Sequence, residues 1–421
     1  MSLRILLINE TPVPTDERAW LEARSLVEVG HVVTVVCPWR DPADDRVRVL
    51  DGVTIRTYPP PAQATGVLGY VWEFSYCWMR SFAMALGQLG RGGFDVVHAC
   101  NPPDTFFLLG AIFKPFGKKY VFAQHDLCPE LWLSRFGAEV APTSAKSKVL
   151  HRGLLFLERM SYRVADRVVV PNESYKAIAR RRGRLADEDV VVIRNGPDLA
   201  KVRMVAPDPR LKRGRDHLVC YLGIMNPQDG IEYLLEAAAH MIRERGRDNV
   251  QFALVGTGDS IDELECQAEK LGIAEHLTFT GWISDSDLLS AYLSTADVCV
   301  APDPKTPLNE KSSFMKIMDY MAVAKPIVAF DLPETKVSAG ASALYAKPND
   351  TSEFGDMIIS LLDDPGARAK MGAMGRQRVE DELEWEHWAR RLVAMYDDLT
   401  RPAESADARE AKAFAAPDEQ V

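Results

Sequence analysis

Residues 304–322 carry hydroxyl, amine and carboxylate side chains at a spacing that suits a phosphorylated ligand. In a helix over 312–323, Ser312, Lys316 and Asp319 would share one stripe, because positions i, i+4 and i+7 lie on the same face. The hydroxyl and free amides at the helix start could hold a diphosphate beside Lys316, and Asp319 could bind ribose hydroxyls. An exposed amphipathic helix with a serine N-cap is the alternative, and both interpretations stay open.

A glycine-containing turn follows another predicted strand. The strand Phe252–Val255 leads into Gly256-Thr257-Gly258 and a helix that opens at Asp259. Two glycines let backbone N–H groups approach a phosphate, and a helix N-terminus adds partial positive charge. A dinucleotide fingerprint has three glycines, and the first strand ends in Asn9-Glu10-Thr11-Pro12 without any. The pattern disfavours a nicotinamide or flavin dinucleotide and leaves a mononucleotide diphosphate open.

These segments belong to two series in which short β-branched runs alternate with amphipathic helical segments, the pattern of βαβ units on parallel sheets. The first series predicts strands at 5–8, 32–36, 53–58, 95–98, 120–123, 167–170 and 190–193, and the second predicts strands at 218–222, 250–255, 277–280, 298–300, 326–329 and 343–346. A polar, proline-containing stretch at 205–215 suits a linker. We therefore predict an α/β protein with two Rossmann-like, doubly wound domains facing a central cleft.

Composition excludes several classes of protein. The chain has 421 residues, of which 47% are apolar, so it is long enough for two or three domains and is not disordered as a whole. No run approaches the roughly 20 apolar residues of a membrane span, and the N-terminus reads as a strand rather than a signal peptide. Seven separated cysteines without a Cys-x-x-Cys pair argue against disulfides and a thiolate metal site. We expect a cytoplasmic protein.

The net charge of −10 is unevenly distributed. Residues 1–200 carry 25 Lys and Arg against 22 Asp and Glu, whereas the remainder carries 25 against 38. Eleven basic residues lie in 146–184 and could face anionic lipid or an anionic acceptor, with a solvated helical face as the alternative. The acidic balance of the whole chain and the absence of a recognisable motif disfavour nucleic acid as a partner.

Six aromatic residues crowd one predicted helix at 68–90: Tyr70, Trp72, Phe74, Tyr76, Trp78 and Phe82. With the basic segment they could form a lipid-interacting surface at the inner face of a membrane. An ordinary buried helix is the favoured interpretation, because Glu73 and the short spacing do not give a clean amphipathic face.

Short motifs in a fixed order run through both halves of the chain. In the first half they are Gly30–Val36, Asp95–His98, Ala123–Glu130 and Arg194–Asp198, and in the second half Tyr221–Gly223, Val255–Gly258, Phe279–Gly281 and Lys316–Val328. Together they resemble the retaining glycosyltransferases of the two-domain GT-B fold, the group called family 4. The resemblance extends to about residue 400. It implies an acceptor-side domain over 1–205, a nucleotide-sugar domain over 206–384, and a final helix at 385–400 that crosses back to the first domain. We expect the tail at 401–421 to be disordered.

The resemblance also implies roles for individual residues. Asp319 takes the second carboxylate position of the family's Glu-x7-Glu motif, and Lys311 occupies the first position, with Glu310 one residue away. The family's Arg and Lys, five apart after the first strand of the second domain, are replaced here by Ile224 and Asp229. We therefore expect Lys311 and Lys316, with His125 as a positioning group, to act at the reacting centre. The other expected donor-side residues are Asn309, Glu310, Ser312, Ser313, Gly256, Gly258 and Trp282, and the expected acceptor-side residues are Asn9, Glu10, Arg18 and Asp126.

Three functions follow as hypotheses. The first is a retaining, metal-independent glycosyl transfer without a cofactor, from a nucleotide sugar, with UDP favoured, to a saccharide or lipid-linked saccharide in polysaccharide or glycoconjugate assembly. The second is epimerisation or hydrolysis of a nucleotide sugar. The third is a catalytically silent subunit that binds a sugar nucleotide, suggested by the missing Arg and Lys. For Trp282, stacking beside the nucleobase and burial in the core both stay open.

Overall fold

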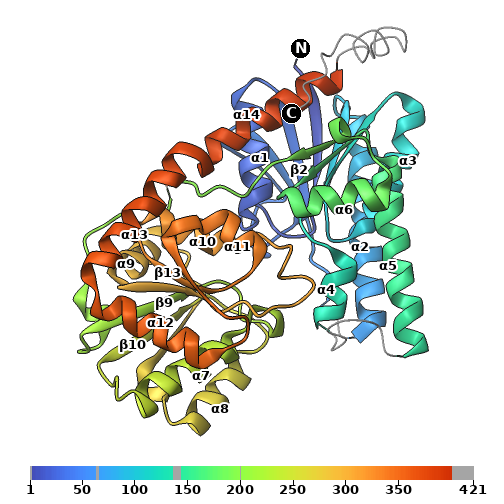
Figure 1. The fold of residues 1–421 in the computed structure, drawn as a ribbon. Coiled ribbons are helices and arrows are strands. Elements are labelled where there is room, and N and C mark those ends of the chain that lie inside the picture. Colours follow the sequence, from blue (N-terminus) through green and yellow to red (C-terminus); the bar gives the residue numbers. More distant parts are fainter. Residues whose placement is uncertain (1, 63–65, 136–143, 200, 401–421) are drawn as a thin grey trace, which may run out of the picture.

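The computed structural model describes residues 2–62, 66–135, 144–199 and 201–400, and it contains two α/β domains, each built on its own sheet (Figure 1). The predicted tail at 401–421 lies outside the described residues. The predicted fold class, with two Rossmann-like domains, is confirmed.

The first sheet has the strand order β3-β4-β2-β1-β5-β6-β7-β8. Its strands are β1 (Arg4–Ile8), β2 (Val32–Pro38), β3 (Val47–Leu50), β4 (Val53–Tyr58), β5 (Val96–Cys100), β6 (Lys119–Ala123), β7 (Arg167–Val170) and β8 (Val190–Val192). All pairs are parallel except β3 with β4. The sequence did not predict β3, a four-residue edge strand that is mostly exposed.

The second sheet has the order β11-β10-β9-β12-β13-β14, with every pair parallel. Its strands are β9 (His217–Leu222), β10 (Val250–Val255), β11 (Leu277–Gly281), β12 (Val298–Ala301), β13 (Ile327–Phe330) and β14 (Ala343–Ala346). The chain order reverses direction between β9 and β12, as it does between β1 and β5 in the first sheet. Ligands of open α/β sheets bind at such switch points, outside the carboxyl ends of the strands.

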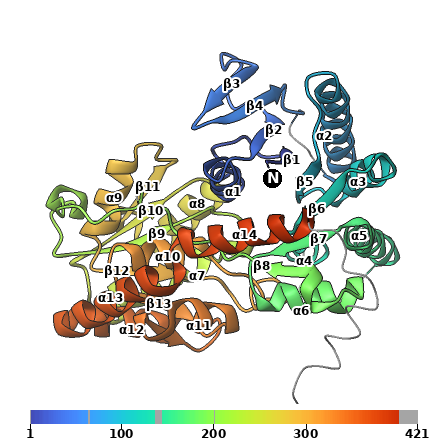
Figure 2. The ribbon, with the colours of Figure 1, turned by 90° about the horizontal axis from the view of Figure 1, so that it is seen from above.

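Helices cover both faces of each sheet (Figure 2). In the first domain they are α1 (Glu17–Glu28), α2 (Gly66–Leu89), α3 (Phe107–Phe113), α4 (Cys128–Arg135), α5 (Ala145–Val164) and α6 (Glu173–Gly183). The remaining helices are α7 (Ile231–Ala239), α8 (Ile261–Leu271), α9 (Ser286–Thr295), α10 (Met315–Ala322), α11 (Pro333–Ala339), α12 (Thr351–Asp363), α13 (Pro365–Arg378) and α14 (Trp385–Thr400). The sequence missed α4 and α11, whose seven or eight residues are too short for a clear periodicity. Among the described helices none is long and apolar enough to cross a membrane.

The last helix, α14, follows the second domain in the chain and packs against α1 of the first domain (Figure 1). Its Trp385 Nε1 donates to Ser25 Oγ at 2.8 Å, and the Tyr396 hydroxyl lies 2.7 Å from His98 Nδ1. The two domains are therefore joined both by the chain between β8 and β9 and by this helix.

Candidate active site

The first-domain wall of the site is the turn after β6, which carries His125 and Asp126. The Asn101 side chain, just after β5, holds this turn: its Oδ1 accepts from the His125 and Asp126 amides at 2.6 and 3.1 Å. Its Nδ2 donates to Asp104 Oδ1 at 2.8 Å and to the Asp126 carbonyl at 2.9 Å. Asn101 thus holds the backbone that carries His125, although sequence reasoning did not single it out. An asparagine between a buried strand and two prolines was the available signal.

The His125 imidazole is neutral at physiological pH. Burial, together with the positive charge of Arg18, lowers the pKa of His125 to about 4. Its Nε2 is buried and has no hydrogen-bond partner among the described residues. Burial also raises the pKa of Asp126 to about 6, although Arg18 opposes that shift. A neutral imidazole with a free nitrogen can position a sugar hydroxyl but does not carry positive charge to a leaving group.

Arg18 is an interior cation rather than an exposed acceptor ligand. It is buried, and its Nε lies 3.3 Å from Glu22 Oε1. Asn9 is buried too, and its side-chain amide donates to Asp16 Oδ2 at 2.8 Å and to the Thr11 carbonyl. The donors of Asn9 therefore hold the turn after β1, and its role on the acceptor side stays a prediction.

Glu10 faces α2 from the end of β1. Its Oε1 is buried without a hydrogen-bond partner, and burial together with nearby Glu73 raises the pKa of Glu10 to about 8. The hydroxyls of Tyr58 and Ser81, both fully buried, interact with each other beside this carboxyl. A protonated carboxyl beside buried hydroxyls is suited to hydrogen bonding with a polyhydroxylated ligand, so Glu10 stays a candidate acceptor-side residue.

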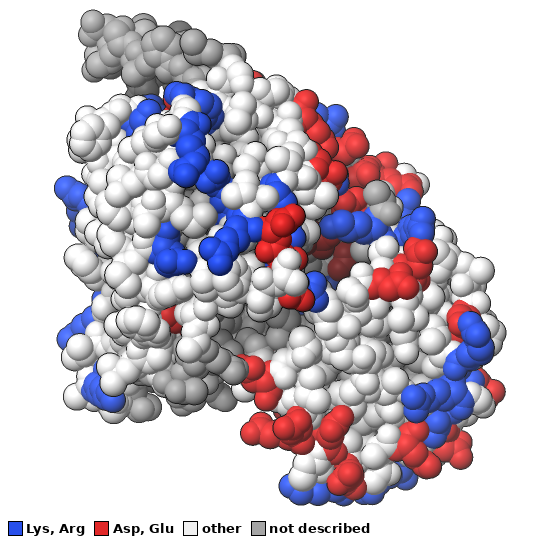
Figure 3. Space-filling model, turned by 180° about the vertical axis from the view of Figure 1, so that it is seen from behind, with Lys and Arg blue, Asp and Glu red and all other residues white. Residues whose placement is uncertain are grey.

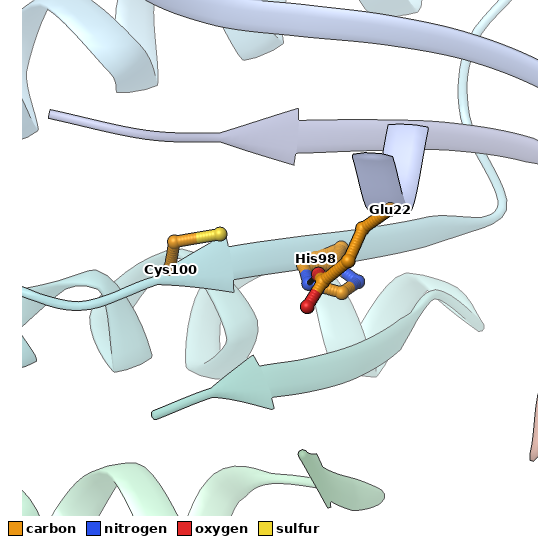
Figure 4. A group of neighbouring side chains, drawn as sticks. All are labelled: Glu22, His98 and Cys100. Carbon is orange, nitrogen blue, oxygen red and sulfur yellow. Dashed lines mark ion pairs between the residues drawn. The ribbon is translucent and has the colours of Figure 1, made fainter. Parts of the chain in front are cut away.

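A second buried cluster in the first domain comes from α1 and β5 (Figure 4). Glu22, His98 and Cys100 bring three ligand-type atoms within 4.8 Å of one another. However, both His98 nitrogens have partners, since Nε2 lies 3.0 Å from Glu22 Oε2 and Nδ1 contacts Tyr396. Burial opposes ionisation of Glu22, but the hydrogen bond and charge of His98, with Arg18, lower its pKa to about 2. The cluster is therefore better described as an internal polar contact that joins α1, β5 and α14 than as a metal site.

The second-domain wall is centred on Lys316, which is only 8% exposed. Its Nζ lies 2.8 Å from Asp303 Oδ1 and 3.4 Å from the Tyr221 hydroxyl. Burial would lower the pKa of Lys316, but the adjacent Asp303 carboxylate outweighs this and raises it, so the ammonium stays protonated. A Cβ placed on Gly223, just after β9, would lie 3.3 Å from Lys316 Cε. The ammonium therefore lies at the switch point, beside the turn that lacks the family's Arg and Lys.

The predicted stripe of Ser312, Lys316 and Asp319 is wrong in one respect. Helix α10 begins at Met315, so Ser312 belongs to the preceding loop and caps nothing. Instead, the Ser312 hydroxyl donates to the Leu308 carbonyl at 3.0 Å. The loop before this helix instead bonds to itself and to the first domain.

Most of the other predicted donor residues in this loop are held by protein contacts. Asn309 is buried and donates to the carbonyls of Gln228 and Pro304, each at 2.9 Å. Lys311 donates to the Pro307 carbonyl, and Glu310 pairs with Lys305 at 3.4 Å. The side-chain amide of Asn309 is thus used within the loop, and the roles expected of Asn309 and Lys311 at the donor stay predictions.

Ser313 and Lys311 instead join the two domains. Asn172, directly after β7, donates from Nδ2 to the Ser313 hydroxyl and to the Lys311 carbonyl, both at 2.8 Å. Nearby, Ser174 Oγ donates to Glu334 Oε1 at 2.5 Å. The loop before α10 therefore lies against the first domain, and Asn172 is a second residue that sequence reasoning missed.

The glycines of the β10–α8 turn are needed for packing. The Gly256 amide donates to the Gly281 carbonyl at 3.2 Å, so it is not free to bind phosphate as predicted. A Cβ on Gly256 would lie 1.9 Å from the Gly223 carbonyl oxygen, and one on Gly258 would lie 2.2 Å from that of Met225. Both glycines let the turns after β9 and β10 approach each other closely.

Asp319 and Trp282 both lie at the boundary between the domains. Asp319 is partly exposed, and burial together with the charge of Glu17 on α1 raises its pKa well above the ordinary range. Trp282 is 52% exposed, so the core interpretation of this residue is wrong. The Arg40 guanidinium of the first domain lies over the Trp282 ring at 5.9 Å.

Two Rossmann-like domains, each with candidate site residues near the switch point of its sheet, are the architecture of the GT-B fold. Residues 18–201 match the family described as Glycosyltransferase Family 4, and residues 216–364 match the one described as Glycosyl transferases group 1. The chain belongs to the group 1/family 4 GT-B glycosyltransferases, and the resemblance inferred from its motifs is confirmed.

Known proteins resemble the chain over most of its length. The Alpha-D-kanosaminyltransferase of Streptomyces kanamyceticus is 27% identical, over 83% of this chain and 92% of that protein. The Phosphatidyl-myo-inositol mannosyltransferase of Mycobacterium leprae is 28% identical, over 73% of this chain and 74% of that protein. In structure, the sucrose-phosphate synthase of Thermosynechococcus elongatus has a TM-score of 0.75 at 20% identity, covering 94% of this chain and 99% of its own. This protein is accordingly a glycosyltransferase of glycoconjugate biosynthesis.

Proposed function

We propose that this enzyme transfers a sugar with retention of configuration from a nucleotide sugar to a saccharide or lipid-linked saccharide. UDP is the favoured carrier, and the reaction needs neither a metal nor a cofactor. A lipid acceptor has precedent, because one relative is named for mannose transfer to phosphatidyl-myo-inositol, and the name of another gives kanosamine as the transferred sugar. We place the acceptor in the first domain and the donor in the second.

The observation that carries the proposal is the protonated Lys316 ammonium beside the turn after β9. A departing nucleoside diphosphate develops negative charge, and a fixed cation in a water-poor site stabilises it. Lys316 has three N–H donors, of which Asp303 takes one and the Tyr221 hydroxyl lies near a second. The remaining donor is available to a phosphate oxygen. We assign the binding of ribose hydroxyls to Asp319, on the next turn of α10.

His125 supplies positioning on the opposite wall. Its neutral ring and unpartnered Nε2 suit a hydrogen bond to a hydroxyl of the transferred sugar, which would hold the anomeric carbon near the acceptor. The first-domain cluster at Glu10 would then hydrogen-bond the acceptor. In this scheme no side chain forms a covalent bond to the sugar.

The test is a panel of UDP- and GDP-sugars, each tried with saccharide and lipid-linked acceptors. A donor at about 100 times its Kd should stabilise the fold by about 2.7 kcal/mol, which identifies the nucleotide by thermal shift. The expected product keeps the anomeric configuration of the donor, as read by NMR, and forms equally well in EDTA. An inverted product, or activity abolished by EDTA and restored by magnesium, would contradict the proposal.

A silent sugar-nucleotide-binding subunit is the second candidate, favoured by one observation: Asp303 neutralises Lys316, and the positions of the family's two cations hold Ile224 and Asp229. Binding of a nucleotide sugar without turnover against every acceptor would support it. Turnover that does not depend on an acceptor would instead indicate the hydrolase or epimerase.

A further inference from the structure

Helix α2 exposes an apolar stripe. Leu68, Trp72, Met79 and Leu86 are all exposed, with Leu68 at 84% and Trp72 at 56%. At 3.6 residues per turn these four positions lie within about 40° of one another around the helix. The helix is therefore not the ordinary buried helix favoured from the sequence: its inner side packs into the domain, and its outer side is apolar as well.

The adjacent helix α3 continues the apolar surface. Its outward positions Leu108 and Ile112 are exposed, and Phe116, in the turn that follows, is 74% exposed. The two helices are neighbours, since Phe82 of α2 and Phe113 of α3 have ring centroids 6.2 Å apart. Isolated apolar side chains on a surface are ordinary, but a contiguous set on adjacent helices marks a binding surface.

Helix α5 packs on the other side of α3 and adds positive charge. Exposed Val149 and Phe156 alternate along it with exposed basic residues: Lys146, Lys148, Arg152, Arg159 and Arg163. Its one acid, Glu158, is fully buried and paired with Arg182 at 2.9 Å. Helix α3 has no acidic residue, and α2 has only the partly buried Glu73. The exposed charges of the three helices are thus all positive.

We propose that this α2–α3–α5 face docks on an anionic phospholipid bilayer. Exposed apolar side chains flanked by Lys and Arg suit the boundary between acyl chains and acidic headgroups, where each cation near the surface adds about 1 kcal/mol. The three helices lie along one side of the first domain, away from the second (Figures 1 and 2). Seen from behind, the first domain shows mainly white and blue surface, while much of the red lies on the second domain (Figure 3).

The docking face and the acceptor side of the site share α2. Its inward Cys77 and Ser81 lie near Glu10 and Tyr58 at the end of the first sheet, opposite the exposed stripe. A lipid-linked acceptor held in the bilayer could thus present its head group to the domain that binds it. Only this last step rests on the proposed function, because vesicle binding itself needs neither donor nor acceptor.

The test is co-sedimentation of the full chain with vesicles of phosphatidylcholine alone or mixed with phosphatidylglycerol. We expect binding to the mixed vesicles that weakens as salt rises, since ions screen the cationic contribution. Trp72→Ser with Phe116→Ser, and separately Arg152→Glu with Arg159→Glu, should each weaken binding at least about tenfold. The matched control, Val337→Ser with Met374→Ser, replaces exposed apolar residues of the second domain and should bind as the wild type does.

Three outcomes would overturn the inference: no binding to mixed vesicles, equal binding by both face variants and the control, or a dimer in sedimentation velocity that the face variants abolish while vesicles stay unbound. Circular dichroism and thermal unfolding establish that each variant is folded. Donor turnover is measured in parallel on the same samples. Turnover without vesicle binding contradicts only the docking face, and vesicle binding without turnover contradicts only the proposed function.

Discussion

At the scale of single residues, the proposed binding of a diphosphate by the second domain depends on the buried pair of Lys316 and Asp303. Both side chains are buried, so removing one leaves the other charge without a partner in a medium of low polarity. The pair holds the ammonium in one place before any donor arrives. A charge fixed in advance stabilises a transition state without the cost of reorganisation.

Lys316→Ala should lower kcat/KM by about two orders of magnitude or more, because it removes the donor assigned to the departing phosphate. Initial rates against donor concentration measure it, with Lys305→Ala as the control, since Lys305 is an exposed loop lysine paired only with Glu310. Near wild-type turnover by a folded Lys316→Ala enzyme would remove Lys316 from the mechanism.

Glu10 makes stability depend on pH. Its pKa is raised from 4.5 to about 8, so its contribution to stability is fully present below pH 4.5 and is lost as pH rises through 8. Glu10→Gln should remove this dependence. Urea unfolding at pH 5.5 and pH 9 should show the wild type losing on the order of 2 kcal/mol more than the variant. Parallel pH profiles for the two proteins would show that Glu10 ionises normally.

At the scale of elements, glycine is required where two backbone segments lie too close together to leave room for a Cβ atom. Gly258→Ala would bring its Cβ within 2.2 Å of the Met225 carbonyl oxygen, so the turns after β9 and β10 must separate. We expect a loss of about 2 kcal/mol or more, together with weaker donor binding, because this turn also lies beside the Lys316 site.

The matched control is Gly153→Ala on α5, where a Cβ meets nothing within 4 Å. Alanine stabilises an exposed helix interior by about 0.5–1 kcal/mol relative to glycine. The two glycine variants should therefore shift the denaturant midpoint in opposite directions. A stabilised Gly258→Ala would show that the turns are not tightly packed.

At the scale of the whole molecule, α14 joins the second domain to the core of the first. Tyr396→Phe removes the hydroxyl that lies against His98 Nδ1 and leaves this buried nitrogen without that partner. The expected cost is about 1–3 kcal/mol in the free energy of unfolding. Tyr345→Phe removes a hydroxyl bound only to the Gly340 carbonyl in a half-buried position and should cost less. Equal losses in chemical denaturation would contradict a special role for the α14 contact.

Much of the fold follows from local sequence pattern. Parallel strands buried on both faces are continuous apolar runs, so β9, β10 and the other central strands were predicted to within a residue or two. The edge strand β3 was missed because exposure removes that pattern. The start of α10 was misplaced, since Ser312 is drawn into a loop by contacts with Leu308 and, through its neighbours, with Asn172.

Some residues of the candidate site were also predicted from the sequence, and others were found only in the structure. Lys316, Asp319 and His125 were predicted from the order of the motifs, which depends on residue types and spacing along the chain. Asp303, Tyr221 and Asn101 were not, since each acts through a partner more than ten residues away in the chain. Asn309, Lys311 and Gly256 offered suitable groups, but those groups are used within the protein.

The sequence by itself determined the two βαβ series and the glycosyltransferase family that its motifs resemble, because these depend on residue types and spacing along the chain. Only the tertiary structure decided that Lys316 is paired with Asp303 and that α2 exposes an apolar side. Helix α2 is apolar almost all round, so its own pattern does not say which side is covered. That depends on which elements pack beside it, and the outer side of α2 has no such neighbour among the described elements.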